Sequence, residues 1–176
     1  MEEPRQRSHP VHGFTLVELM VVLAVFTILA SAGIPALQSM VADHRHAAYV
    51  NTLVGHIQRA RTEAVRRGHP ATLCPSADAS TCDNGGWQDG WLLFADEDGD
   101  GSVDTGEDLL AIGEDLPGSR TAYNRNRLTF LYDGTTPFNG TFTLTLCDAS
   151  QARVTRLVIS RGGRLRKVNG TPSNCP

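Results

Sequence analysis

The chain has 176 residues, which leaves room for one modest globular domain and an appendage. Its formal net charge of −3 hides a division: residues 71–117 contain twelve acidic residues and no Lys or Arg, whereas residues 118–176 contain nine basic and two acidic residues. This asymmetry predicts a cation near the first segment and a polyanion near the second.

An apolar run near the N-terminus contains a single charged residue. Between Phe14 and Ala42 that residue is Glu18. The run is long enough to span a bilayer, which takes about 20 helical residues. A secretory signal peptide fits poorly, because the run is too long and no small-residue cleavage site closes it. An ordinary membrane anchor leaves Glu18 unexplained, since a carboxylate in a bilayer costs about 2.5–3.5 kcal/mol and should have a partner.

Cleavage between Gly13 and Phe14 would supply that partner, because it creates an α-amine four residues before Glu18. In an assembly, the amine of one subunit can meet the carboxylate of its neighbour. The sequence "GFTLVEL", followed by an apolar helix with Pro35, resembles the class III signal of type IV pilins and pseudopilins. The resemblance implies that prepilin peptidase removes residues 1–13 as a leader, that Phe14 is N-methylated, and that Glu18 directs assembly.

A second helical pattern follows the apolar run. Over residues 43–69 apolar residues recur at spacings of three and four, which predicts an amphipathic helix with one stripe facing a core. Pro35 should kink the first half of the helix rather than end it, and Gly68 with Pro70 should stop the second half. Four arginines near its end are interpreted as solvated side chains favoured by the helix dipole. The stripe is Val50, Leu53, Val54, Ile57, Ala60, Ala64 and Val65, and the arginines are Arg59, Arg61, Arg66 and Arg67.

The remainder, residues 70–176, predicts a β-rich head. "TFTLTLC" and "RVTRLVIS" alternate apolar and polar residues, so one face of each strand should pack and the other should face water. The expected fold is α+β and type IV pilin-like: a long helix, with a membrane half (14–42) and an amphipathic half (43–69), packed on antiparallel sheet. Strands are predicted at 71–74, 90–95, 109–112, 128–133, 141–147, 153–160 and 164–168.

Four cysteines all lie beyond the apolar run. Neither CxxC spacing nor a nearby His cluster suggests zinc. Of the three connectivities, the local one is favoured: Cys74 with Cys82 closes a short loop, and Cys147 with Cys175 pins the C-terminal tail. Two disulfides imply an oxidising compartment such as a periplasm.

An acidic loop follows a Trp-containing strand. "GGWQDGWLLFADEDGDG" resembles the Gly-Trp strand and acidic turn of the FimT/GspH family of minor pilins and pseudopilins. Residues 96–107, "DEDGDGSVDTGE", match the twelve-position calcium-loop pattern. The alternative is an exposed turn without a metal, because a strand rather than a helix precedes the loop. The expected calcium ligands are Asp96, Asp98, Asp100, the carbonyl of Ser102, Asp104 and Glu107.

The C-terminal tail is basic. Arg164 and Arg166 should share one side of an extended segment, either as charges that protect an edge strand or as a binding site. "GRLR", residues 163–166, is similar to the GRxR motif of FimT minor pilins that bind DNA during natural transformation. The resemblance implies binding of DNA, expected to be double-stranded. Because few aromatic residues lie nearby, phosphate contact should dominate and binding should be largely independent of sequence. Neutralising about four phosphates predicts a log–log salt slope of roughly −3 to −4. The implied residues are Arg161, Gly163, Arg164, Arg166 and Lys167, with Tyr123, Phe130, Tyr132 and Phe138 as nearby aromatic candidates.

These features predict a minor type IV pilin, closest to FimT, that binds extracellular DNA for uptake. Its expected partners are other pilins, prepilin peptidase, the inner membrane and DNA. It should cross the inner membrane of a Gram-negative bacterium once, with its head in the periplasm, and then enter an extracellular filament. The rival interpretations are a GspH-like minor pseudopilin of type II secretion and an assembly-priming minor pilin, neither of which binds DNA.

Enzyme activity is not expected. The sequence contains no Gly-rich phosphate loop, no GxSxG and no HExxH motif. His44 and His46 are two residues apart, so they do not share a helical face as a metal pair would. No catalytic residue is predicted, and no cofactor other than calcium is considered.

Overall fold

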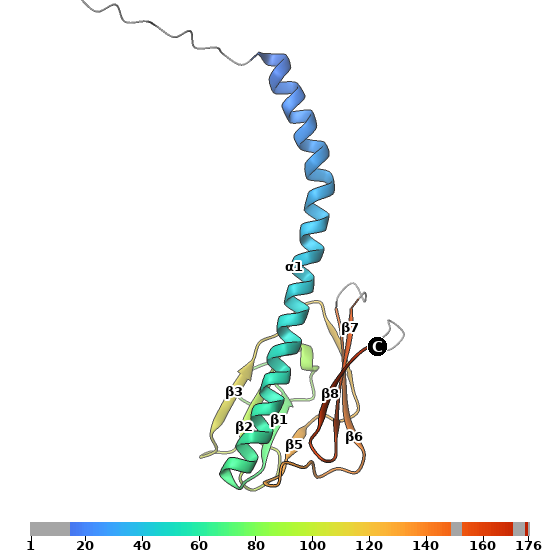
Figure 1. Ribbon diagram of the computed structural model, residues 1–176. Helices are drawn as coiled ribbons and strands as arrows, with labels where there is room; N and C mark the ends of the chain where they lie inside the picture. Colours follow the sequence, from blue (N-terminus) through green and yellow to red (C-terminus); the bar gives the residue numbers. More distant parts are fainter. Residues whose placement is uncertain (1–14, 149–152, 171–174, 176) are drawn as a thin grey trace, which may run out of the picture. The chain divides into compact units, whose positions relative to one another are not determined.

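One long helix precedes a β-rich head in the computed structural model, which describes residues 15–148, 153–170 and 175 (Figure 1). The chain divides into two compact units, Met1–Ala42 and Asp43–Pro176. Helix α1 (Leu16–Arg67) is continuous across this division. The other elements are β1 (Ala71–Pro75), the 3-10 helix η1 (Trp87–Asp89), β2 (Trp91–Ala95), β3 (Leu109–Gly113), β4 (Arg120–Tyr123), β5 (Leu128–Phe130), β6 (Thr141–Cys147), β7 (Val154–Ser160) and β8 (Leu165–Asn169).

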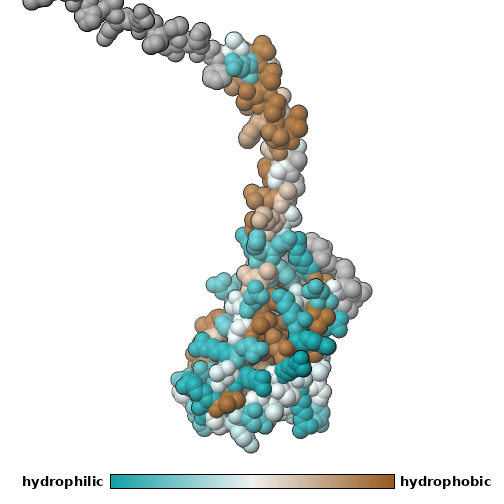
Figure 2. All heavy atoms as spheres, in the orientation of Figure 1, coloured by the Kyte–Doolittle hydropathy of each residue, from teal (hydrophilic) through white to brown (hydrophobic). Residues whose placement is uncertain are grey.

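The first half of α1 is apolar. Thr15 caps the helix, because its Oγ1 accepts a hydrogen bond from the Glu18 N–H at 3.2 Å. The helix continues through Pro35, as predicted. Large apolar side chains from Leu16 to Val41 are exposed, and Figure 2 shows them covering this half. Within the described residues, α1 is the one helix long and apolar enough to cross a membrane.

The second half of α1 buries one stripe in the head, as its spacing predicts. Val65 is an exception, since it is 54% exposed and Ala64 takes the inward position next to it. The helix ends in a left-handed glycine: Gly68 has φ +73°, and its N–H donates to the Ala64 carbonyl at 3.0 Å. The buried residues of the stripe are Tyr49, Val50, Leu53, Ile57, Ala60 and Ala64.

The strands of the head form two four-stranded antiparallel sheets, here called sheet A and sheet B. Sheet A has the order β3-β2-β1-β5, and sheet B has the order β4-β6-β7-β8. A long N-terminal helix with antiparallel sheets is the type IV pilin-like α+β fold that the sequence predicts.

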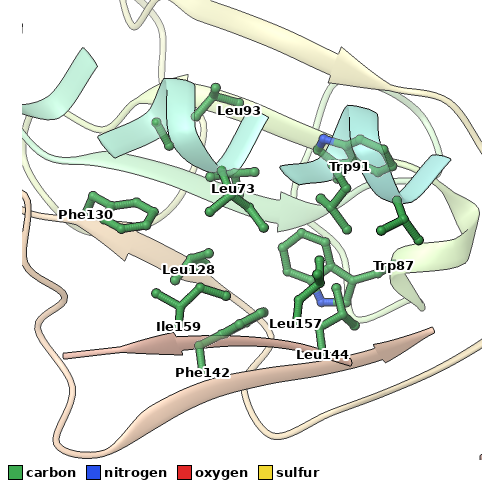
Figure 3. Packing of buried hydrophobic residues seen from close by; sticks show 14 of the residues in the cluster. Leu73, Trp87, Trp91, Leu93, Leu128, Phe130, Phe142, Leu144, Leu157 and Ile159 are labelled. Atoms are coloured by element: carbon green, nitrogen blue, oxygen red, sulfur yellow. The ribbon is translucent and has the colours of Figure 1, made fainter. Parts of the chain in front are cut away.

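Both sheets contribute to one hydrophobic core together with the buried stripe of α1. Its aromatic residues pack edge to face: the ring centroids of Tyr49 and Trp91 are 5.1 Å apart, and those of Trp87 and Phe142 are 5.7 Å apart. Figure 3 shows Trp91 on the sheet A side of the core and Phe142 on the sheet B side, with Trp87 between them. Each large apolar side chain buried in this way contributes about 1.5–3 kcal/mol to folding.

Two details of the strand prediction are wrong. The predicted strands do not include β4, because its four residues show no clear alternation, and its pairing with β6 decides its conformation. Strand β5 ends at Phe130 rather than Asp133, because a turn follows in which the Gly134 N–H donates to the Leu131 carbonyl at 2.8 Å.

Candidate nucleic-acid interface

The basic motif "GRLR" lies at the tight turn between β7 and β8. The Ser160 N–H donates to the Arg164 carbonyl at 3.1 Å, and the Gly163 N–H donates to the Ser160 carbonyl at 2.8 Å. These bonds close the hairpin and set where β8 begins. Because β8 is an edge strand of sheet B, its basic side chains can remain in water.

The register of β8 decides which basic residues share a face. Arg166 is paired with Val158, and Lys167 is paired with Leu157, which is fully buried in the core. Paired residues in antiparallel strands point to the same face. Arg166 therefore lies on the outer face of sheet B, as does Arg164 two residues earlier, whereas Lys167 points to the core-facing side.

A shallow depression of about 260 Å³ on the outer face of sheet B brings the two motif arginines together. Arg164 and Arg166 supply its charge, while Thr141 and Ser160 supply hydroxyl groups and Val158 a small apolar patch. Guanidinium groups beside hydroxyl groups are suited to phosphate oxygens. The arrangement can bind an anion, and none of the described residues that line it carries a carboxylate.

The other predicted residues of the DNA site have different positions. Lys167 faces the helix side of sheet B, where burial lowers the pKa of His46, with the Asp148 charge opposing this shift and the Lys167 charge adding to it. Arg161 is exposed in the turn, and its carbonyl accepts a hydrogen bond from the Thr136 N–H at 2.8 Å. Gly163 is buried at the base of the turn.

Gly163 has no room for a side chain. Its φ is +72°, and a Cβ would lie 2.1 Å from the Gly134 carbonyl oxygen. Arg61 of α1 holds the two loops together: its Nε donates to the Gly134 carbonyl at 3.1 Å, and its Nη2 donates to the Gly162 carbonyl at 3.3 Å. The interpretation of Arg61 as a merely solvated residue is wrong, because its guanidinium fastens the turn that carries the motif.

The nine basic residues of the second half do not all contribute to the depression. Arg153 forms ion pairs with Asp43 and, at 3.2 Å, with Asp148. Arg127 contacts the acidic loop, where its Nη1 donates to the Asp100 carbonyl at 3.4 Å. These two arginines stabilise the fold of the head.

Three of the four aromatic candidates are held by contacts within the head. Phe130 is fully buried, and the Tyr123 hydroxyl donates to the Gly85 carbonyl at 3.2 Å. The ring of Phe138 is covered by Arg125, whose guanidinium lies 4.6 Å from its centroid. Tyr132 is 65% exposed. The depression itself has no aromatic lining, so phosphate contact is the chemistry it favours.

The acidic loop joins β2 to β3 and is folded around its own carboxylates. Asp96 is buried and accepts hydrogen bonds from the Thr72 hydroxyl at 2.5 Å and the Gly101 N–H at 3.1 Å. Glu107 closes the loop by accepting the N–H groups of Glu97 and Asp104 at 2.8 Å and 3.0 Å.

Carboxylate oxygens in this loop gather closely enough to hold a cation. Asp96, Asp98 and Glu107 each place an oxygen within 4.8 Å of the others, and so do Asp98, Asp100 and Asp104. Calcium takes six to eight oxygen ligands at 2.3–2.6 Å, which fits this donor set. Exposed acidic groups also gather without a metal, so calcium binding stays a prediction from the sequence.

Both disulfides have the predicted local connectivity, Cys74–Cys82 and Cys147–Cys175. The second bond ties Cys175, near the C-terminus, to the end of β6. The processing residues Gly13 and Phe14 lie outside the described residues. Glu18 is exposed in the first turn of α1.

Two family models match separate parts of the chain. Residues 49–163 match the family model described as Type II transport protein GspH, and residues 9–34 match the prokaryotic N-terminal methylation motif. The chain belongs to the GspH family. It is therefore a minor pilin or pseudopilin of the GspH type, and its methylation motif implies processing by prepilin peptidase and assembly with other pilins.

Solved structures support the same fold. The GspH-family chain is similar to the type IV minor pilin FimU of Pseudomonas aeruginosa in two crystal forms, with 20% identity and TM-scores of 0.52 and 0.53, over 74% of this chain and 91% and 96% of that chain. It is also similar to the minor pseudopilin EpsH from the Type 2 Secretion System of Vibrio cholerae, with 14% identity and a TM-score of 0.48, over 68% of this chain and 92% of that chain. Among curated proteins, none matches the chain.

Replacing Gly163 by Ala is expected to destabilise the head of this GspH-family protein by about 1–3 kcal/mol, because φ is positive and the new Cβ meets the Gly134 carbonyl. The neighbouring Gly162 is a matched control, since a Cβ there meets nothing within 4 Å. Urea unfolding of both variants measures the difference. Equal stability of Gly163→Ala and Gly162→Ala would contradict the proposed tight turn.

Calcium should bind the acidic loop with a dissociation constant of roughly 10⁻⁴–10⁻³ M, as in extracellular modules. Isothermal titration of the full-length protein in detergent micelles measures this directly. Asp98→Asn/Asp100→Asn should abolish the heat, whereas Glu114→Gln, an exposed acid outside the loop, should leave it unchanged. Absence of heat at millimolar calcium would rule out the site.

Proposed function

We propose that this minor pilin binds double-stranded DNA at the outer face of sheet B and that the filament brings this DNA to the cell. The observation that carries the proposal is the placement of Arg164 and Arg166 together in one depression beside two hydroxyl groups. If the arginines only protected the edge strand from aggregation, scattered charges would be enough. That role would not explain the hydroxyl groups or the turn held by Arg61. Two guanidinium groups on one face of the sheet edge can instead bind successive phosphates of a DNA backbone.

The mechanism that we propose begins with DNA outside a Gram-negative cell. The head, exported to the periplasm and then carried by an extracellular filament, presents the depression to the phosphate backbone. Arg161 in the adjoining turn supplies a third positive charge. Retraction of the filament would then bring the bound DNA to the outer membrane. Since the contacts are to phosphates, binding should depend strongly on salt and little on sequence.

The position of Lys167 lowers the expected number of phosphate contacts from about four to about three. The salt dependence of binding should accordingly have a log–log slope of about −2.7, because each neutralised phosphate contributes about −0.9. A single module with so few contacts should bind weakly, and several copies or other filament subunits would raise the overall affinity.

Fluorescence anisotropy of a labelled duplex tests the site with full-length protein in neutral detergent micelles over a salt series. Arg164→Gln/Arg166→Gln should weaken binding and lower the magnitude of the salt slope by about 1.8, which is two phosphate contacts. Arg127→Gln is the matched control, since Arg127 contacts the acidic loop. Unchanged binding in the double variant would place the DNA site elsewhere. No binding by the wild type at low salt would favour the pseudopilin or assembly-priming functions.

We also propose that Glu18 pairs with the α-amine of a neighbouring subunit in the filament. The support is its isolation, because among the residues from Phe14 to Ala42 it is the only charged one. Breaking a charge pair in a low-dielectric interface costs about 2–5 kcal/mol, so Glu18→Ala should reduce incorporation by at least roughly tenfold. Immunoblots of sheared filaments against total protein measure it. Thr27→Ala is the control, as its hydroxyl bonds only within the helix, and normal incorporation of Glu18→Ala would refute the pairing.

A further inference from the structure

Strand β3 is an edge strand without the charges that protect β8. It pairs with β2 on one side, and no strand among the described residues pairs with its other side. Its sequence, "LLAIG", contains no charged residue and no Pro. An edge of this kind presents a row of unpaired N–H and C=O groups to which another extended segment can pair.

The two faces of β3 offer different surfaces beside this edge. Leu109 and Ile112 are 46% and 50% exposed, and their pairing with Phe94 and Leu92 places them on the outer face of sheet A. Soluble proteins usually place a charge at such edge positions. The outer face at this edge is therefore apolar and open to water.

The core-facing side of the same edge opens into a cavity of about 560 Å³ between α1 and the segment 112–117. Trp91 forms part of its wall, and its indole lies so close to Gly113 that a Cβ there would be 2.0 Å away. The Trp91 Nε1 donates to His56 Nδ1 at 3.0 Å, which fixes the indole in place. The apolar and aromatic lining includes Ala48, Tyr49, Trp91 and Leu116.

The charge around the cavity is mainly negative. Glu114 and Asp115 directly follow β3, are exposed and line the cavity, and neither forms an ion pair within the described part of the chain. Asp89 and Asp115 act with burial to raise the pKa of the Tyr49 hydroxyl, so both carboxylates lie near that ring. Among the described residues of the lining, Arg45 and His56 are the two basic ones. Burial lowers the pKa of His56, which favours its uncharged form.

We propose that the free edge of β3 binds an extended segment of another filament subunit, which adds a fifth strand to sheet A. Side chains of a strand alternate between faces. One set would enter the cavity beside Tyr49 and Trp91, and the other would cover Leu109 and Ile112. The segment should therefore be apolar at alternate positions and basic at the end that lies beside Glu114 and Asp115. Backbone pairing gives the affinity, and the two apolar faces give the specificity.

This partner site goes beyond the proposed DNA binding and uses the opposite sheet. Strand β8, the edge of sheet B, carries Arg166 and Lys167 and directly follows Arg164, whereas β3, the edge of sheet A, is apolar and bordered by acids. A change at β3 should therefore leave binding of the labelled duplex unchanged.

A synthetic peptide tests the site, with full-length protein in neutral detergent micelles and hydrogen exchange read by mass spectrometry. The peptide has nine residues, with valine at alternate central positions and lysine at both ends. It should slow amide exchange in residues 109–113 by roughly tenfold. A peptide of the same sequence with N-methylated central amides keeps the side chains but cannot pair, and it should give no slowing.

Two variants test whether the apolar outer face at this edge takes part in binding. Ile112→Lys, at a half-exposed position that does not contribute to the core, should abolish the slowing, whereas Tyr132→Lys, at a residue that is 65% exposed elsewhere, should retain it. No slowing with the wild type, or equal slowing with the N-methylated peptide, would overturn the proposal. Slowing of residues 109–113 by concentrated protein alone would identify a second copy of this chain as the occupant and overturn the assignment to another subunit.

Discussion

The contact on which the head depends is the burial of one α1 stripe against both sheets. Leu53, Ile57 and Ala60 are almost fully buried, and the same core contains Trp91 from sheet A and Phe142 from sheet B. The sheets are each only four strands wide, and each must cover an apolar face. The helix supplies the surface on which both sheets pack. The positions of the loops at the sheet ends therefore depend on how α1 packs against the sheets.

Arg61 links α1 to the turn that carries the basic motif. The helix residue bonds carbonyls in two loops that are separated along the chain, at Gly134 and Gly162. Those bonds satisfy the part-buried Gly134 carbonyl and the exposed Gly162 carbonyl, and they hold the β7–β8 turn against the head. Arg164 and Arg166 consequently project from a fixed turn, which reduces the ordering entropy lost when a ligand binds. Gly163 is required because two backbones approach each other there.

The two sheets expose edges of opposite character. Strand β8 carries Arg166 and Lys167 and directly follows Arg164, whereas β3 is uncharged, with Asp108 before it and Glu114 and Asp115 after it. An edge strand of a secreted protein needs protection from uncontrolled pairing. In a filament subunit, an unprotected edge strand such as β3 can instead pair with a segment of another subunit. The acidic and basic halves of the sequence thus correspond to separate surfaces of the head, with Arg127 and Arg153 used within the fold.

The sequence by itself determined the fold class, the processing motif and most elements, because these depend on local patterns. The period of 3.6 residues in α1, the alternation in β6 and β7, and the turn residues are all short-range features. Tertiary structure decided the rest. The pairing of Lys167 with Leu157 places Lys167 on the core-facing side, and burial keeps Phe130 from contacting DNA. Strand β4 forms by pairing with β6, and Arg61 holds the β7–β8 turn. These outcomes depend on contacts between residues far apart in the chain, which no local pattern encodes.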